Sequence, residues 1–155
     1  MFPFKVRFSR TIKTRINPDQ IDSLLDISRD ILSDGGSYYF SKENNRLKFD
    51  NKFFKLTSSW NLMAPIDAGF VEISETKENR TIIRYSITLI SVLIISSIIA
   101  IIVWISSKDF FGPWIALMAF GGLSILNWVI AVLRHWGLLY TMTDRMMDNV
   151  MKDKK

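Results

Sequence analysis

Two long apolar stretches in the C-terminal half constrain this chain more than any other feature. Residues 85–105 and 113–133 are each 21 residues long and contain no Asp, Glu, Lys, Arg or His. At about 1.5 Å per residue, a helix of that length extends about 31 Å, which matches the bilayer core of about 30 Å. Neither stretch has the polar face of a surface helix in a soluble protein. The sequence therefore predicts a two-helix transmembrane hairpin.

Basic residues near the two stretches predict their orientation. Those on the side of the termini are Lys77, Arg80, Arg84, Arg134 and Arg145. The connecting residues 106–112 hold only Lys108 as a basic residue, and Asp109 opposes it. The positive-inside rule then places both termini in the cytoplasm. We expect a multi-pass protein of a bacterial inner membrane.

Residues 1–84 have the patterns of a small cytosolic α+β domain. Period-two alternation predicts strands at residues 4–16, 37–42, 46–50, 52–57, 69–76 and 80–85. A helix is predicted at 18–33, because Asn17 and Pro18 suit its start and Gly35-Gly36 suits its end. This order predicts an antiparallel sheet with one helix across a face. The last strand leads almost directly into the first apolar stretch, so we expect the sheet close to the membrane surface.

The C-terminal part divides into the hairpin domain at 85–136 and a third segment at 137–155. In the third segment Leu139, Met142, Met146 and Val150 follow helical spacing, opposite Asp144, Arg145 and Asp148. This pattern predicts an amphipathic cytosolic helix, bent or straight at Gly137, followed by a basic tail.

Composition excludes several classes of function. The chain has no Cys and one His, which excludes disulfides, cysteine zinc sites, iron–sulfur clusters and multi-histidine metal sites. The net charge is +5, but residues 1–84 hold 14 Lys/Arg interspersed with 11 Asp/Glu, so no basic stripe for nucleic acid forms. No phosphate-binding loop, nucleophile motif or pair of catalytic acids is found. We therefore assign no catalytic residue, cofactor or metal, and we expect no enzyme.

Aromatic residues near the ends of the stretches predict contacts with the membrane interface. Trp104 and Trp114 lie at the outer end, and Tyr85 and Trp136 at the inner end. Trp60 lies in the apolar segment 58–69, which has no clear period. That segment either folds back onto the core or reaches the headgroups or a partner, and we predict an interfacial Trp60.

Small residues at spacings of three and four predict surfaces for close helix packing. They are Ser96 and Ala100 in the first stretch and Ala116, Ala119, Gly121 and Gly122 in the second. Asn127 is costly within a span unless it is paired, so it is expected to bond to the first helix or to another subunit. His135 is expected to contact headgroups, and haem ligation or pH sensing is the alternative.

The layout of a strand-rich domain that leads through residues 69–73 and 81–87 into a helical hairpin resembles many short bacterial membrane proteins. The resemblance is one of architecture, and it carries no motif and no site. The first hypothesis is a non-enzymatic accessory or scaffold subunit, with the lipid bilayer and either other membrane subunits or further copies as partners. The alternative is a module that binds lipid or a small ligand between sheet and helix.

Overall fold

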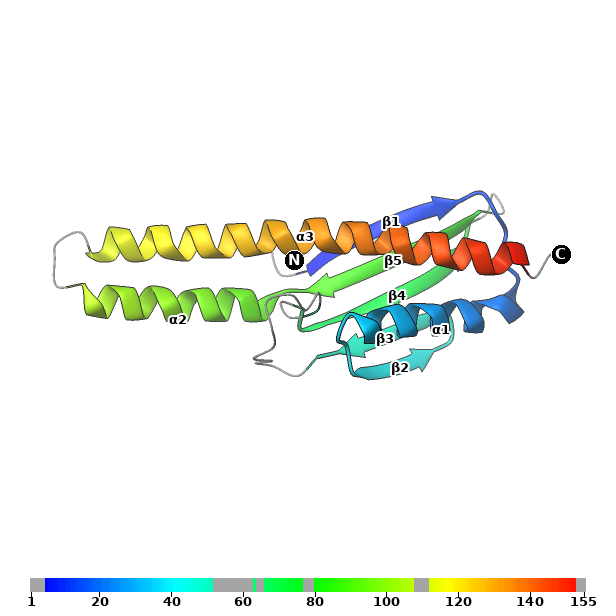
Figure 1. Cartoon of the computed structure of the whole chain (residues 1–155), viewed down its shortest axis with the longest axis horizontal. Coiled ribbons are helices and arrows are strands. Elements are labelled where there is room, and N and C mark those ends of the chain that lie inside the picture. Colours follow the sequence, from blue (N-terminus) through cyan, green and yellow to red (C-terminus); the bar gives the residue numbers. More distant parts are fainter. Residues whose placement is uncertain (1–4, 52–62, 64–65, 77–79, 108–111, 153–155) are drawn as a thin grey trace.

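The computed structural model describes residues 5–51, 63, 66–76, 80–107 and 112–152. In this part the chain is α+β, with a five-stranded antiparallel sheet and three helices (Figure 1). The elements are β1 (Lys5–Ile12), α1 (Pro18–Asp34), β2 (Tyr39–Glu43), β3 (Arg46–Asp50), β4 (Ala68–Glu75), β5 (Thr81–Thr88), α2 (Ile90–Ser106) and α3 (Gly112–Lys152). The predicted fold class of the N-terminal domain is confirmed.

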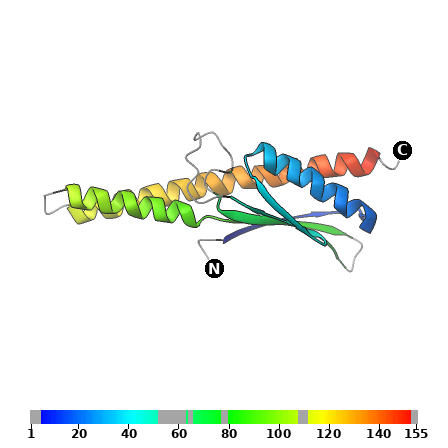
Figure 2. The same cartoon turned by 90° about the horizontal axis from the view of Figure 1, so that it is seen from below.

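The strands lie in the order β1-β5-β4-β3-β2, and each neighbouring pair is antiparallel. β5 is the interior strand that connects the sheet to α2, and it pairs with β1 on one side and β4 on the other. Helices α1 and α3 lie on one face of the sheet, and no described helix covers the other face (Figure 2). We call this second face the open face.

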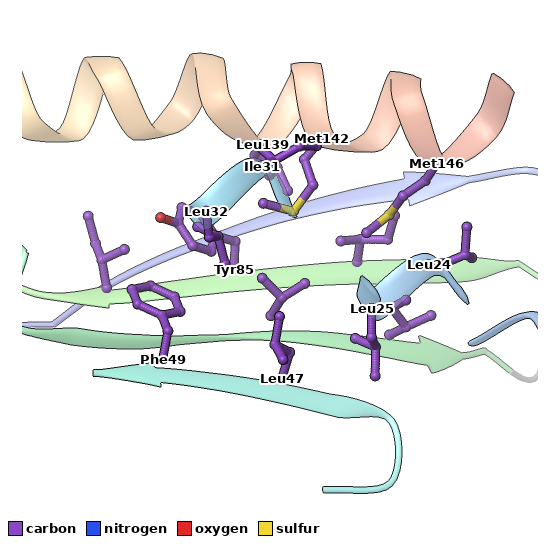
Figure 3. Close-up of a cluster of buried hydrophobic side chains, with 14 of the residues drawn as sticks. Leu24, Leu25, Ile31, Leu32, Leu47, Phe49, Tyr85, Leu139, Met142 and Met146 are labelled. Carbon is purple, nitrogen blue, oxygen red and sulfur yellow. The ribbon is translucent and has the colours of Figure 1, made fainter. Parts of the chain in front are cut away.

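The core lies between the sheet and these two helices, as Figure 3 shows. α1 contributes Leu24, Leu25, Ile31 and Leu32, α3 contributes Leu139, Met142, Met146 and Val150, and the sheet contributes Leu47, Phe49, Val71, Ile73 and Ile83. The sheet residues alternate along each strand, because successive side chains point to opposite faces. The core therefore contains residues of α3, and the N-terminal domain is completed by the C-terminal helix.

The ends of α1 follow the predicted signals. The backbone N–H of Asn17 donates to Gln20 Oε1 at 3.3 Å, and Pro18 occupies the first helical position. At the other end Gly36 has φ 98°, a left-handed conformation that glycine adopts without steric cost. The N–H of Ser37 then donates to the Leu32 carbonyl at 2.9 Å. This bond closes the helix and directs the chain into β2.

α3 is one helix of 41 residues that continues through Gly137. Its first half lies beside α2, and its second half lies across the sheet (Figure 1). It contains both the second apolar stretch and most of the predicted amphipathic helix. By length and composition it is the one helix in the described part that can cross a membrane.

The first apolar stretch is not a single helix, which corrects the prediction for residues 85–105. Its first four residues belong to β5, which ends at Thr88, and α2 has 17 residues, or about 26 Å. The strand extends this far because its backbone groups pair with both β1 and β4, and because Tyr85 and Ile87 are buried. One helix of spanning length therefore stands where two spans are predicted. The predicted strand at 52–57 lies outside the described residues.

Candidate functional site

The small residues of α2 and α3 fall into two groups. Ser96 and Ala116 are buried, with relative exposures of 2% and 8%, and Ala100 and Ala119 are half-buried. Ala100 and Ala116 line one groove between the two helices, so small side chains there allow close approach. Gly121 and Gly122 differ, because a Cβ added at either meets no atom within 4 Å. Contacts within the described part of the chain would therefore allow a side chain at both positions.

Asn127 is exposed on the apolar half of α3. It therefore does not lie in the buried contact with α2, which was one of the two partners expected for it. The other expected partner, a second subunit, is consistent with an exposed amide. By helical spacing Asn127 lies about 140° around α3 from Gly122, so the two residues mark different sides of the helix.

The tryptophans predicted at the interface are exposed where the structure describes them. Trp104 and Trp114 lie near the connection between α2 and α3, and Trp136 follows His135, which contacts Tyr85 of β5. Trp60 lies outside the described residues.

Tyr85 is not at an interface, which is a further correction. It is fully buried in β5 and stacks between Phe8 and Phe49, with ring centroids 5.9 and 6.1 Å away. Gly69 permits this packing, because an added Cβ there would lie 2.4 Å from the Phe49 ring. Burial raises the pKa of the Tyr85 hydroxyl well above its ordinary value.

His135 is the polar partner of Tyr85 and not a headgroup contact. It is fully buried on α3, and 2.7 Å separate its Nδ1 from the Tyr85 hydroxyl oxygen. This hydrogen bond joins β5 to α3, between residues 50 positions apart. The pair therefore fixes the position of α3 along β5. The His135 ring is therefore a structural contact between α3 and β5.

Asp67 was not singled out from the sequence, and it caps α2. Its Oδ2 accepts from the backbone N–H of Ile90 and of Ser91, the latter at 2.9 Å, and its Oδ1 accepts from the Ser91 hydroxyl. α2 needs this help because the residue before it, Leu89, has no side chain that can cap a helix. The sequence contained one signal for such a cap. The residue before this apolar helix cannot cap it, so a side chain from elsewhere in the chain is expected to do so.

The open face carries an ionic cluster around Glu72. Its carboxylate bonds to Arg46 and, at 2.9 Å, to Arg84. The bond from Arg46 is the main cause that lowers the pKa of Glu72, and Arg84 adds to it against the opposing effect of burial. The three residues come from β3, β4 and β5, so the cluster connects neighbouring strands.

A groove of about 380 Å³ separates α2 from α3 close to the sheet. Its lining is apolar except for Ser124, and the residues are Leu89, Val92, Leu93, Ser124, Ile125, Trp128 and Val129. The Ser124 hydroxyl is buried and has no hydrogen-bond partner in the part of the chain that the structure describes. A buried hydroxyl without a partner is unfavourable, so this position suits a ligand atom that accepts a hydrogen bond.

The described residues contain no group of three or more His, Asp or Glu side chains that could hold a metal ion. No protein-family model, no curated protein and no solved structure matches this chain. The functional argument therefore depends on the geometry alone.

Proposed function

We propose that this chain is a non-enzymatic, membrane-anchored accessory or scaffold subunit of a larger membrane complex. α2 and the first half of α3 cross the bilayer as a hairpin of a multi-pass inner-membrane protein. The sheet domain and both termini lie on the cytoplasmic side. The observation that carries the proposal is Asn127, an exposed amide on an exposed apolar helix surface.

The exposure of α3 supports its place in a membrane. Only 17% of its apolar segment is buried within the chain, whereas the core helix of a soluble protein is mostly buried. Large apolar side chains on this surface, such as Leu126 and Leu133, are each 59% exposed. Soluble monomers rarely expose contiguous apolar patches of more than a few hundred Å². Lipid or another membrane protein is therefore the expected surrounding.

α2 is compatible with a crossing despite its length. A helix of 17 residues is at the lower limit for a span, and a bilayer adapts to short spans by local thinning. Trp104 and Trp114, both exposed, suit the outer headgroup level, and Trp136 suits the inner one.

Asn127 supports association rather than anchoring alone. An amide that faces hydrocarbon without a partner is unfavourable, and a polar group on a neighbouring helix removes that cost. Gly122 adds a second contact point, since the space above its Cα is open and a partner helix can approach closely there.

The test of association is co-purification after gentle detergent extraction. Asn127→Leu should weaken partner retention or self-association by about 0.5–2 kcal/mol. Gly122→Leu should block close approach, whereas Gly137→Leu, at a glycine with equally open surroundings, should not. The matched amide control is Asn149→Leu in the distal part of α3. Equal retention by all four variants would reject an accessory role through either of these sides of α3.

The test of orientation uses the absence of native cysteine. Single cysteines at Ser107 and Ser41 should differ in labelling by an impermeant thiol reagent on intact cells. We expect labelling at Ser107 and none at Ser41. The reverse pattern would invert the topology, and equal labelling would contradict a hairpin that crosses the membrane.

A second candidate function is lipid binding in the groove between α2 and α3, and the unpartnered Ser124 hydroxyl favours it. A lipid would place an acyl chain against Val92 and Trp128 and an ester carbonyl near Ser124. Native mass spectrometry of the extracted monomer should then detect bound lipid that Ser124→Ala loses. Ser97→Ala, whose hydroxyl already donates to the Leu93 carbonyl, is the control. Unchanged lipid retention in Ser124→Ala would exclude this role.

A further inference from the structure

The open face of the sheet consists of rows of side chains in register, and these rows differ in charge. The row nearest α2 runs through Lys5, Thr88, Ala68, Asp50 and Tyr39. Only Leu89 separates Thr88 from α2, so this row lies beside the start of that helix. The open face therefore begins at the level where α2 enters the membrane in the proposed arrangement.

The second row runs through Arg7, Ser86, Phe70, Lys48 and Ser41. It has two basic residues and no acidic one. The third row runs through Ser9, Arg84, Glu72, Arg46 and Glu43, in which two basic residues are balanced by two acidic residues. Counted together, the two rows nearest α2 hold Lys5, Arg7 and Lys48 against Asp50. The positive excess on this face is thus confined to its end beside α2.

Phe70 lies at the centre of this charged end. The Lys5 Nζ is 5.3 Å from the centre of its ring, and the Arg46 Cζ is 4.5 Å from it. Around the ring the surface forms a hollow of about 540 Å³, whose charged lining residues are Lys5, Arg46, Lys48 and Asp50. We call this site the basic hollow. It combines cationic groups with an apolar ring and lies on the same end of the face as α2.

We propose that the basic hollow binds the phosphate-bearing headgroup of an anionic phospholipid from the bilayer that holds α2 and α3. The inference rests on the proposed function, because it needs the membrane at that level. Lys5 complements the phosphate together with Lys48, which also pairs with Glu43 at 2.7 Å. Phe70 lies between them and packs against the headgroup. Basic groups close to an anionic leaflet are attracted to it within about 8–10 Å, which favours the two rows nearest the surface.

The same charge pattern disfavours nucleic acid as the ligand. Nucleic-acid surfaces have basic residues that continue along a face, in order to follow the phosphate backbone. On this sheet the positive excess ends after the second row, because the third row holds two acidic residues beside its two basic ones. Glu72 pairs with both Arg46 and Arg84 of that row, and Glu43 pairs with Lys48 of the second row. A single headgroup fits a site of this extent.

The test is a titration of the full chain in detergent with fluorescent short-chain phosphatidylglycerol, with phosphatidylcholine as the reference lipid. Lys5→Gln combined with Lys48→Gln should weaken phosphatidylglycerol binding about 25-fold, since each basic residue near a phosphate contributes about fivefold. Lys13→Gln combined with Lys152→Gln removes the same charge from exposed sites away from the hollow and is the matched control. It should leave binding unchanged, and millimolar inorganic phosphate should not displace the lipid.

Three results would overturn the inference. Equal affinity for the two lipids would mean that the headgroup is not recognised. Equal losses in the two double variants would mean that net charge alone acts. Displacement by inorganic phosphate would assign the hollow to a free anion. Carbonate extraction of the same variants separates this inference from the proposed function, because a chain that stays in membranes without lipid selectivity loses only the headgroup site. A chain that carbonate releases contradicts the membrane anchor itself.

Discussion

The two halves of α3 share one continuous helix but have opposite surroundings. In the first half, large apolar side chains such as Met118 and Leu126 are exposed, and α2 covers one side only. In the second half, Met142 and Met146 are fully buried against the sheet, and Asp144 and Asp148 lie on the exposed side. Exposed apolar residues in the first half require a surrounding other than water, whereas the polar side of the second half is suited to water.

The comparison shows that helical spacing alone does not decide where apolar residues go. Both halves have enough apolar residues to pack against the rest of the chain. What differs is the opposite side of the helix, which is apolar in the first half and charged in the second. The change of surroundings falls near Arg134 and His135, where α3 meets β5 through the Tyr85 contact.

The largest expected effect is on the free energy of unfolding, compared between one substitution in each half of α3. Met142→Ala should lower the free energy of unfolding of the sheet domain by about 2–5 kcal/mol, because it leaves a cavity in the core. Met118→Ala, at a residue that is 68% exposed, should change it by less than about 0.5 kcal/mol. Denaturant titration in mild detergent, followed by circular dichroism, measures both. Equal effects would contradict the difference in burial.

A smaller effect is expected at the hydrogen bond that marks the boundary. Tyr85→Phe removes the hydroxyl 2.7 Å from His135 Nδ1 and should cost about 1–3 kcal/mol. Tyr140→Phe is the control, because Tyr140 is 43% exposed and its ring contact with Arg10 survives the change. If both variants unfold at the same denaturant concentration, the buried bond does not fix α3 to the sheet.

The burial of the Tyr85 hydroxyl should also make the stability of the fold depend on alkaline pH. The pKa of Tyr85 is raised in the folded chain, so above pH of about 10 the unfolded chain has released a proton that the folded chain still holds. Stability should therefore fall as pH rises, by at most about 1.4 kcal/mol per pH unit for this one proton. Tyr85→Phe should flatten that slope. An identical slope in the variant would assign it to other groups.

The smallest effect concerns the exposed edge of the second half. Arg10 bonds to Asp144 at 2.7 Å, and its guanidinium lies 4.5 Å from the centre of the Tyr140 ring. Arg10→Gln should cost about 0.5–1 kcal/mol, since both contacts are partly solvated. Asp144→Asn isolates the ionic part in a double-mutant cycle. A coupling of zero would leave only the contacts of Arg10 with the ring and the carbonyl oxygen of Tyr140.

Much of the sheet domain could be predicted from local patterns. Alternation between apolar and polar residues located β3 at the predicted residues, and the capping residues located α1 within one residue of its observed end. The spacing of Leu139, Met142, Met146 and Val150 indicated the face that α3 buries. These signals are local, because each depends on the periodicity of a single element.

The boundary between β5 and α2 could not be predicted in this way. Tyr85, Ile87 and the residues of α2 form one apolar run, and such a run is compatible with a buried strand as well as with a helix. The choice depends on pairing with β1, whose residues lie about 80 positions earlier. The same holds for His135 and Asp67, whose partners come from other elements. His135 was predicted to contact headgroups, and Asp67 was placed in a loop segment. Their actual contacts, with Tyr85 and with the start of α2, exist only in the tertiary fold.

The continuity of α3 also has a mechanical consequence. A helix of 41 residues is about 62 Å long, and no break separates its apolar half from the half that carries the sheet. In a bilayer, a change in the tilt of the apolar half would therefore move the other half as a rigid continuation of the same helix. Its 19 residues beyond Leu133 extend about 28 Å, so a change in tilt of about 10° would swing the distal end by about 5 Å. The sheet and α1 are packed on this part of the helix and would move with it, so in the proposed arrangement membrane thickness would set the position of the sheet.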